Sequence, residues 1–239
     1  MALLECEDLT RLFGGLRAVG NLSFRVDDGE IVGLIGPNGA GKTTVFNLIT
    51  GFVRPSGGAI RLDGRDIAGL KPHAVARRGV ARTFQIVKPF PGLSARENVT
   101  LGAFLRHRTR RDAESAASDV LEKVGLAHRA GVRAGELNLM DQKRLEMAKA
   151  LATSPRVLLL DEPMGGLNPS EVDAASDIVE SIRKAGVTVV LVEHVMKAIM
   201  RISDRVVVMH HGEKIAEGAP SSVVQDPAVV AAYFGPRGR

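Results

Sequence analysis

The sequence predicts an α/β fold with a mostly parallel sheet, and three apolar segments are the main evidence for it. They are residues 31–35, 157–160 and 187–192, and each is followed directly by glycine-rich or polar residues. Short apolar segments of this kind are typical of strands that are buried on both faces of a parallel sheet. Ligands bind at the carboxyl ends of such strands, so the residues after each segment are candidate site residues.

The turn after residues 31–35 matches the phosphate-binding pattern G-x-x-x-x-G-K-[ST]. Glycines let backbone N–H groups surround a polyphosphate closely, and the start of the next helix adds a positive dipole end. In this pattern Lys42 reaches the β- and γ-phosphates, and the hydroxyl of Thr43 binds Mg²⁺. The alternative is a plain glycine-rich turn, but chance matches to the whole pattern are rare. The predicted nucleotide contacts here are Gly36, Asn38, Gly39, Ala40, Gly41, Lys42, Thr43 and Thr44.

The other segments, taken in order, place two lobes around this core. Residues 2–12 and 20–31 alternate apolar and polar residues, which predicts an antiparallel N-terminal β lobe. Residues 86–151 have mostly helical periodicity between two core strands, and they predict a helical lobe. We therefore expect one domain over residues 1–239, a P-loop NTPase core that carries both lobes. Further strands are expected at 59–62, 80–84 and 206–209, and helices at 67–78, 113–124, 141–151 and 171–183.

Composition narrows the class of protein further. The chain has 239 residues and no apolar run near the ~20 residues that a membrane helix needs. Its first residues lack the basic-then-apolar order of a signal peptide, and its single cysteine fits a reducing compartment. The net charge of +5 permits an anionic partner without identifying one. The basic run at residues 106–111 has no interleaved aromatic residue, so we expect a solvated surface and no nucleic-acid partner.

Two acids follow the segment at 157–160, and a histidine follows the segment at 187–192. Asp161 would hold Mg²⁺ through water, and Glu162 would orient and polarise a water that attacks a γ-phosphate. His194 would hydrogen-bond the γ-phosphate or brace that water. Alone, the acids would be a polar strand end and the histidine a structural residue. Beside a phosphate-binding turn, they favour hydrolysis of a nucleoside triphosphate.

The order and spacing of these motifs resemble those of the ATP-binding subunits of ABC transporters, along essentially the whole chain. The motifs are GPNGAGKTT, ARTFQ, LLLDEP and VEH. The resemblance implies that Gln85, in the loop that joins core and helical lobe, takes part in catalysis and in binding Mg²⁺. It implies that His194 is the switch histidine. Phe13 could stack on adenine or pack as a satellite core residue on position alone, and the resemblance favours stacking; Val19 completes the predicted nucleotide contacts.

The resemblance extends to one group of importers, those for branched-chain amino acids. FGGLRAV, LITGFVRPSGG, GLNPSE and the tail DPAVVAAYFG are similar to that group. It implies a head-to-tail dimer with a second ATP-binding subunit, identical or different, that binds ATP at the interface. It also implies membrane permease subunits, an indirect solute-binding protein and a peripheral place on the cytoplasmic face of the membrane. The alternatives are an importer for another amino acid, urea or an amide, and a nucleotide-binding regulatory module with weak hydrolysis.

One stretch departs from the family pattern. Relatives have L-S-G-G-Q at the start of the last long helix of the helical lobe, where this chain has Leu137-Asn138-Leu139-Met140-Asp141. In the family this stretch meets the γ-phosphate held by the opposite subunit. We expect Leu139 and Met140 to crowd a backbone that must approach that phosphate closely, and Asp141 to add an anion near it. The sequence therefore predicts weak ATPase activity for the chain alone, while a partner with an intact stretch would restore it.

Overall fold

A mostly parallel sheet forms the centre of the computed structural model, which describes residues 2–85 and 87–235. Within these residues the sheet has six strands in the order β10-β9-β3-β8-β7-β6, and only β10 runs antiparallel to its neighbour. This confirms the predicted α/β fold. The strands are β3 (Ile31–Ile35), β6 (Val80–Arg82), β7 (Val157–Asp161), β8 (Thr188–Val192), β9 (Arg205–His210) and β10 (Glu213–Gly218).

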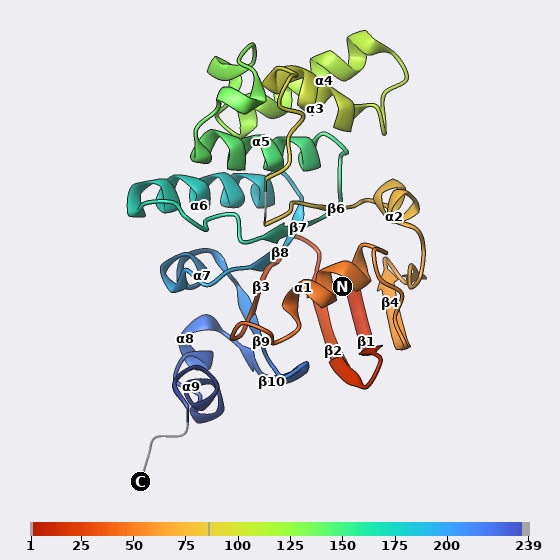
Figure 1. Cartoon of the computed structure of the whole chain (residues 1–239), viewed down its shortest axis with the longest axis vertical. Coiled ribbons are helices and arrows are strands. Elements are labelled where there is room, and N and C mark those ends of the chain that lie inside the picture. The colour runs from red at the N-terminus through yellow and green to blue at the C-terminus, as the bar shows by residue number, and fades with distance from the viewer. Residues whose placement is uncertain (1, 86, 236–239) are drawn as a thin grey trace.

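An antiparallel sheet lies beside the central sheet, with helix α1 (Lys42–Ile49) packed between them (Figure 1). The buried face of α1, including Phe46 and Ile49, joins apolar residues of both sheets in one core cluster. This sheet is the predicted N-terminal β lobe, in the order β2-β1-β4-β5. Its strands are β1 (Ala2–Phe13), β2 (Leu16–Asp27), β4 (Gly57–Leu62) and β5 (Arg65–Asp66).

Helices cover the opposite face of the central sheet and form a separate lobe at the top of Figure 1. Lobe helices α3 and α5 pack on each other and on α4, around a second apolar cluster. Ile86, where the predicted lobe begins, lies outside the described residues, so the lobe boundaries stay a prediction. The helices are α2 (Pro72–Arg78), α3 (Ala95–Ala103), α4 (Arg110–Lys123), α5 (Leu139–Leu151), α6 (Pro169–Lys184), α7 (Met196–Ile202), α8 (Pro220–Val223) and α9 (Pro227–Phe234), with short 3₁₀ turns at Ala127–Arg129 and Ala134–Glu136.

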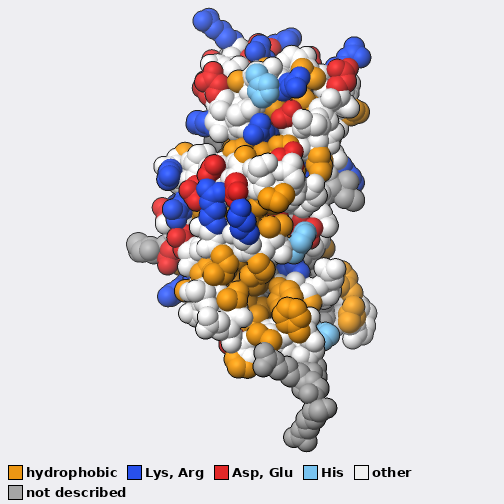
Figure 2. All heavy atoms as spheres, turned by 90° about the vertical axis from the view of Figure 1, so that its left-hand side faces the viewer, with side chains coloured by type: hydrophobic (Ala, Val, Ile, Leu, Met, Phe, Trp, Pro, Cys, Tyr) orange, Lys and Arg blue, Asp and Glu red, His pale blue; other side chains and the backbone are white. Residues whose placement is uncertain are grey.

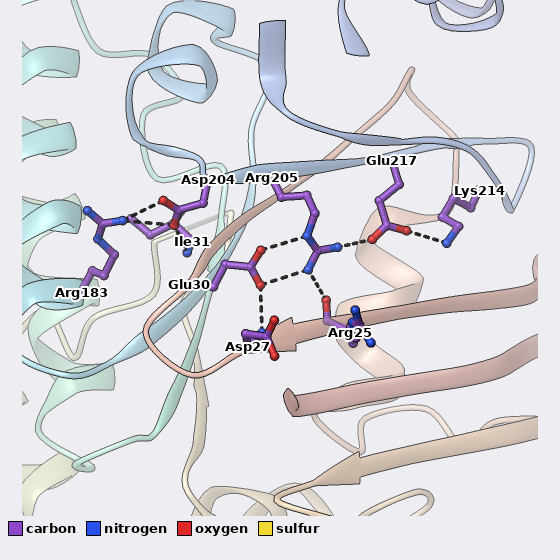
Figure 3. Close-up of polar contacts among 9 residues, drawn as sticks. All are labelled: Arg25, Asp27, Glu30, Ile31, Arg183, Asp204, Arg205, Lys214 and Glu217. Atoms are coloured by element: carbon purple, nitrogen blue, oxygen red, sulfur yellow. Dashed lines mark hydrogen bonds and ion pairs between the residues drawn. The ribbon is translucent and has the colours of Figure 1, made fainter. Parts of the chain in front are cut away.

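Charged side chains join the end of the β lobe to the central sheet (Figure 3). Arg205 on β9 forms a two-point ion pair with Glu30, with nitrogen–oxygen distances of 2.9 and 3.0 Å, and also pairs with Glu217 on β10. The same guanidinium donates to the carbonyl oxygen of Arg25 at 2.6 Å. Paired Arg–carboxylate contacts fix direction as well as distance. This network therefore fixes the position of β2 relative to β3, the strand that precedes the phosphate-binding turn.

Three predicted elements differ from the structure, and one strand is additional. Phe13 is the last residue of β1 rather than a loop residue, because Gly14-Gly15 turns the chain at once into β2, which ends at Asp27. The helix expected at 67–78 begins at Pro72, since proline suits the first turn of a helix and would break its interior. The strand expected at 80–84 ends at Arg82. Strand β10 is not among the predicted strands, because its half-buried and exposed residues lack an apolar pattern.

Candidate functional site

The glycine-rich turn lies between β3 and α1, as predicted, and two of its glycines cannot be replaced without a clash. At Gly36 the φ angle is +150°, and an added Cβ would overlap the carbonyl oxygen of Met209 on β9. At Gly41 the φ angle is +104°, and an added Cβ would lie 2.5 Å from the carbonyl oxygen of Ala18 on β2. Only glycine combines these angles with such close neighbours. The turn is thus held between two strands that come from distant parts of the chain.

Lys42 folds back over this turn. Its ammonium group donates to the carbonyl oxygens of Gly36 at 2.6 Å and Pro37 at 2.9 Å. Burial lowers the pKa of Lys42 below its ordinary value, and the carboxylates of Glu162 and Asp161 oppose that shift. The lysine and both acids therefore share one electrostatic environment at the carboxyl ends of β3 and β7.

Asp161 ends β7 and is almost completely buried. Its Oδ2 atom pairs with Arg82 at 2.6 Å, and its backbone N–H donates to the Thr83 hydroxyl at 3.1 Å. Its Oδ1 atom is buried and has no hydrogen-bond partner. A buried carboxylate oxygen without a donor is costly, so this atom is suited to a cation or a bound water that enters from the cavity.

Three residues predicted to bind the metal, Thr43, Gln85 and Asp161, line the same cavity, which has a volume of about 830 Å³. The described ranges contain no group of three or more His, Cys, Asp or Glu side chains placed to hold a metal ion. Mg²⁺ usually keeps several waters and takes only one or two carboxylates beside substrate phosphates. The donor set fits Mg²⁺ that arrives with a nucleotide, rather than an ion held by protein alone.

Glu162 follows in the left-handed region, with a φ angle of +50°. Its carboxylate accepts a 2.8 Å hydrogen bond from the amide of Gln85, and the Nδ1 atom of His194 lies 3.8 Å from the same oxygen. Gln85 comes from the segment after β6 and His194 from the segment after β8. The three residues predicted to be catalytic thus meet from three strand ends. The left-handed backbone is unusual for glutamate and is often found at functional positions.

The comparisons with known proteins agree with this geometry. A family model described as ABC transporter matches residues 19–165, which is more than half of the chain. The chain belongs to the ABC transporter family. A second model, described as branched-chain amino acid ATP-binding cassette transporter, matches residues 213–235.

Individual relatives cover nearly all of this ABC chain. It is 45% identical to the high-affinity branched-chain amino acid transport ATP-binding protein BraF of Pseudomonas aeruginosa, over 98% of both chains. It is 42% identical to LivG of Escherichia coli, which has the same description, again over 98% of both. Among solved structures, a nucleotide-free ATP-binding cassette from an ABC transporter has a TM-score of 0.90 and 29% identity, over 98% of this chain and 100% of that one. The ADP conformation of MJ1267, another ATP-binding cassette, has a TM-score of 0.90 and 30% identity, over 98% of this chain and 99% of that one.

The other predicted nucleotide contacts of the cassette lie around the turn. Asn38 and Thr43 are exposed, whereas Ala40 is buried and offers mainly its backbone. Phe13 is 44% exposed, and the guanidinium of Arg11 lies 4.4 Å from the centre of its ring. Val19 is fully buried in the β lobe core, so its side chain has no free surface for a nucleotide in this structure. These contacts stay predictions; Val19 is the one that the geometry does not support.

The stretch at 137–141 is less disruptive in the structure than its sequence suggests. Asn138 caps α5 by accepting the Asp141 N–H at 2.8 Å. Met140 is buried in the core of the helical lobe, and the Asp141 carboxylate is turned inward, 3.8 Å from Arg129 and 3.5 Å from Arg144. The expectations that Met140 would crowd the approach to the phosphate and that Asp141 would place an anion near it are therefore corrected. Only Leu139, 43% exposed, presents an apolar side chain at the helix start.

Four residues with direct links to the site were not found from the sequence. Arg82 pairs with Asp161, as described above. The ammonium of Lys143 donates to the Glu162 carbonyl oxygen, and the Glu193 carboxylate accepts from Met164, His194 and Val195. Burial raises the pKa of the Tyr233 phenol on α9, and the nearby Gly36 backbone opposes that shift. An arginine inside the apolar segment at 80–84 is a signal that could have pointed to Arg82, whereas Lys143 stands among the polar residues 141–144 and has no such signal.

Proposed function

We propose that this chain is the ATP-binding and ATP-hydrolysing subunit of an ABC importer for branched-chain amino acids. The observation that carries the proposal is the meeting of Glu162, Gln85 and His194 beside the Lys42 turn and Asp161. The substrate class follows BraF and LivG, whose descriptions name branched-chain amino acid transport, and the C-terminal match at residues 213–235. An importer for another amino acid, urea or an amide is the alternative substrate assignment.

In the proposed reaction, ATP phosphates replace the loop carbonyls as partners of the Lys42 ammonium. Mg²⁺, held by Thr43, Gln85 and Asp161, would supply positive charge that offsets the charge on the phosphates. Glu162 accepts a hydrogen bond from a water, whose oxygen bonds to the γ-phosphorus as the bond to the bridging oxygen of ADP breaks. The proton of the water passes to Glu162. The imidazole of His194 donates a hydrogen bond to an oxygen of the γ-phosphate as ADP leaves. Gln85 keeps the Glu162 carboxylate aimed at the water.

Two surfaces support the proposed partners. The cavity at the site continues to the helical lobe and contains Phe52 and Phe84, 56% and 42% exposed, whose rings meet edge to face at 5.8 Å. Apolar rings at the rim of a groove suit a helix inserted by a permease subunit. Membrane attachment is proposed to occur through this permease, since the helices in the described part of the chain are each too short or too polar to span a bilayer.

The second surface is the apolar face shown in Figure 2, on the side of the molecule that carries α7 and α9. Exposed apolar side chains of these helices include Met196, Met200 and Phe234. Large apolar patches mark protein–protein contacts, and Tyr233 of this face is near enough to the phosphate-binding turn for the Gly36 backbone to affect its pKa. We assign it to the second ATP-binding subunit; a solute-binding protein would act indirectly, through the permease.

The test is to co-purify the chain with its permease subunits and reconstitute the complex in proteoliposomes with the solute-binding protein. We expect ATPase activity that leucine, isoleucine or valine stimulates. Stimulation by another amino acid or urea would change the substrate assignment. The exposed Leu139 favours one second candidate, a regulatory nucleotide-binding module, and MgATP binding without turnover in the assembled complex would select it over the motor.

A further inference from the structure

A buried carboxylate, Glu193, ties together the backbone on two sides of the proposed hydrolytic centre. Its side chain has no exposed surface. One oxygen accepts the N–H of Met164 at 2.8 Å, and the other accepts the N–H groups of His194 and Val195 at 2.8 and 3.0 Å. Met164 follows Glu162 by two residues. A carboxylate is the side chain best suited to accept three backbone donors at once, since both its oxygens are acceptors.

A lysine of the helical lobe reaches the same place from the other side. Lys143 lies on α5, two residues after the 137–141 stretch, and 7% of its surface is exposed. Its ammonium group donates to the carbonyl oxygen of Glu162 at 2.8 Å. Burial lowers its pKa, and the nearby Glu193, Glu162, Asp161 and Glu146 oppose that shift. A buried ammonium that donates to a backbone carbonyl fixes the position of that carbonyl closely.

We propose that Glu193 and Lys143 are positioning residues. They hold the Glu162 carboxylate and His194 at fixed positions relative to each other and connect them to the helical lobe. Glu193 fixes the segments after β7 and β8 relative to each other, and Lys143 attaches the first of these segments to α5. The proposal rests on the proposed function, because it assigns a role in ATP hydrolysis. It gives roles to two residues to which the sequence analysis assigned none.

The backbone conformation of Glu162 explains why these positioning contacts are needed. Its left-handed φ angle of +50° persists only where the surroundings hold it. The Glu162 N–H donates to the Val192 carbonyl at 2.9 Å and its carbonyl accepts from Lys143, so both backbone groups are engaged. A shift of α5 relative to the sheet would pull on this carbonyl and turn the Glu162 side chain. The geometry therefore couples the position of the helical lobe to the water-activating carboxylate.

A purely structural ion cluster predicts different behaviour. It would lower stability when broken, and MgATP affinity and turnover would fall together as folded protein is lost. A positioning role predicts that kcat falls while MgATP affinity and KM are kept, because Lys42 and the turn are untouched. Glu193→Gln is the sharpest variant, since it keeps the volume but places an NH₂ group against backbone N–H donors.

The experiment uses the full complex and compares Glu193→Gln and Lys143→Met with wild type. Glu97→Gln is the carboxylate control, because Glu97 accepts the Ser94 N–H at 2.7 Å at an exposed helix start, and Lys123→Met is the exposed lysine control. We expect kcat to fall at least about tenfold in both test variants, with the Kd and KM for MgATP within about twofold and the controls unchanged. Amide hydrogen exchange at residues 161–165 and 193–196 should become faster, with no change in β3.

Wild-type kcat with both variants, or a parallel loss of kcat and MgATP affinity, would overturn the proposal. If Glu193→Gln fails to fold, Lys143→Met carries the test alone. If the wild-type complex binds MgATP but does not turn it over, the proposed function fails. Amide exchange then still tests whether Glu193 and Lys143 hold these segments, since unchanged exchange in both variants would reject that role.

Discussion

Arg82 and Asp161 form an ion pair of 2.6 Å inside the cassette, with 5% and 3% of their side-chain surfaces exposed. The same guanidinium donates to the Asn47 side-chain oxygen at 2.6 Å and lies 5.0 Å from the centre of the Phe84 ring. Arg82 thus links β6, α1 and β7 beneath the proposed metal site. Its charge also holds the Asp161 carboxylate in place while the other carboxylate oxygen has no partner.

We predict that Arg82→Met lowers the free energy of unfolding by about 3–5 kcal/mol, because it leaves a buried carboxylate without its partner. Urea unfolding without nucleotide measures this loss. Arg61→Met is the matched control, since Arg61 pairs with Glu7 on the surface, where 41% and 59% of the two side chains are exposed. We expect little change there. Equal effects of the two substitutions would contradict the role given to the buried pair.

Gly36→Ala should disable the phosphate-binding turn. The backbone angle alone costs about 1–3 kcal/mol for a residue with a Cβ, and the added atom would overlap the Met209 carbonyl. We expect a loss of stability of at least that size and at least a tenfold weaker Kd for MgATP, measured by thermal unfolding and calorimetry. Gly92→Ala is the control, because a Cβ there has no atom within 4 Å. MgATP affinity equal to wild type in Gly36→Ala would refute the close fit of the turn.

The lowered pKa of Lys42 should make both the stability of the fold and the affinity for MgATP depend on pH. Its pKa in the folded chain is below 10.5 because it is buried, while the unfolded chain has the ordinary value. Between the two values the folded chain has lost a proton that the unfolded chain keeps, so the free energy of unfolding rises with pH in this window. Bound phosphates favour the ammonium form, so MgATP affinity should fall as pH rises through the lowered pKa, with uptake of a proton.

Calorimetry in buffers of different ionisation enthalpy would measure that uptake over the pH range below the ordinary lysine pKa of 10.5. Lys184→Met is a control on the exposed end of α6, and its profile should match wild type. A wild-type affinity that is flat or rises over this range would show that Lys42 does not bind the phosphates as its ammonium form.

Leu139→Gly should raise the ATPase rate of the assembled complex, by up to about a hundredfold, because it frees the start of α5 to approach a phosphate. Met140→Gly should instead lower the free energy of unfolding by about 2–5 kcal/mol, since Met140 is buried in the helical lobe. Steady-state ATPase and urea unfolding check the two outcomes. Rebuilding the whole family pattern at 137–141 would combine the gain in ATPase rate with the loss of stability. If Leu139→Gly leaves the rate unchanged, the exposed leucine is not what limits activity.

Much of this architecture could be predicted because it depends on local pattern. The apolar runs of β3, β7 and β8 are buried throughout, and their ends place Lys42, Asp161 and His194 at one edge of the sheet. Strand β10 could not be predicted in the same way, since it is a polar edge strand held by pairing with β9. The antiparallel lobe was expected, but the exact turn at Gly14-Gly15 depended on hairpin pairing.

The parts of the site that were missed depend on contacts between distant residues. Arg82 is 79 positions from Asp161, and Lys143 is 19 from Glu162. No local periodicity reports such pairs. The inward turn of Asp141 depends partly on such a contact, since one of its two arginine partners, Arg129, lies before α5 on another turn of the lobe, while Arg144 is on α5 itself. Motifs thus indicate which atoms do the chemistry, and the fold shows which atoms hold them.

The most direct test of the account replaces Glu162 with glutamine in the assembled complex and measures MgATP binding and ATP hydrolysis side by side. Glutamine keeps the size of the side chain but cannot accept the proton of the attacking water. The account predicts a Kd for MgATP close to wild type and hydrolysis at least about a hundredfold slower. Hydrolysis near the wild-type rate in Glu162→Gln would contradict the assignment of this carboxylate, and with it the proposed reaction.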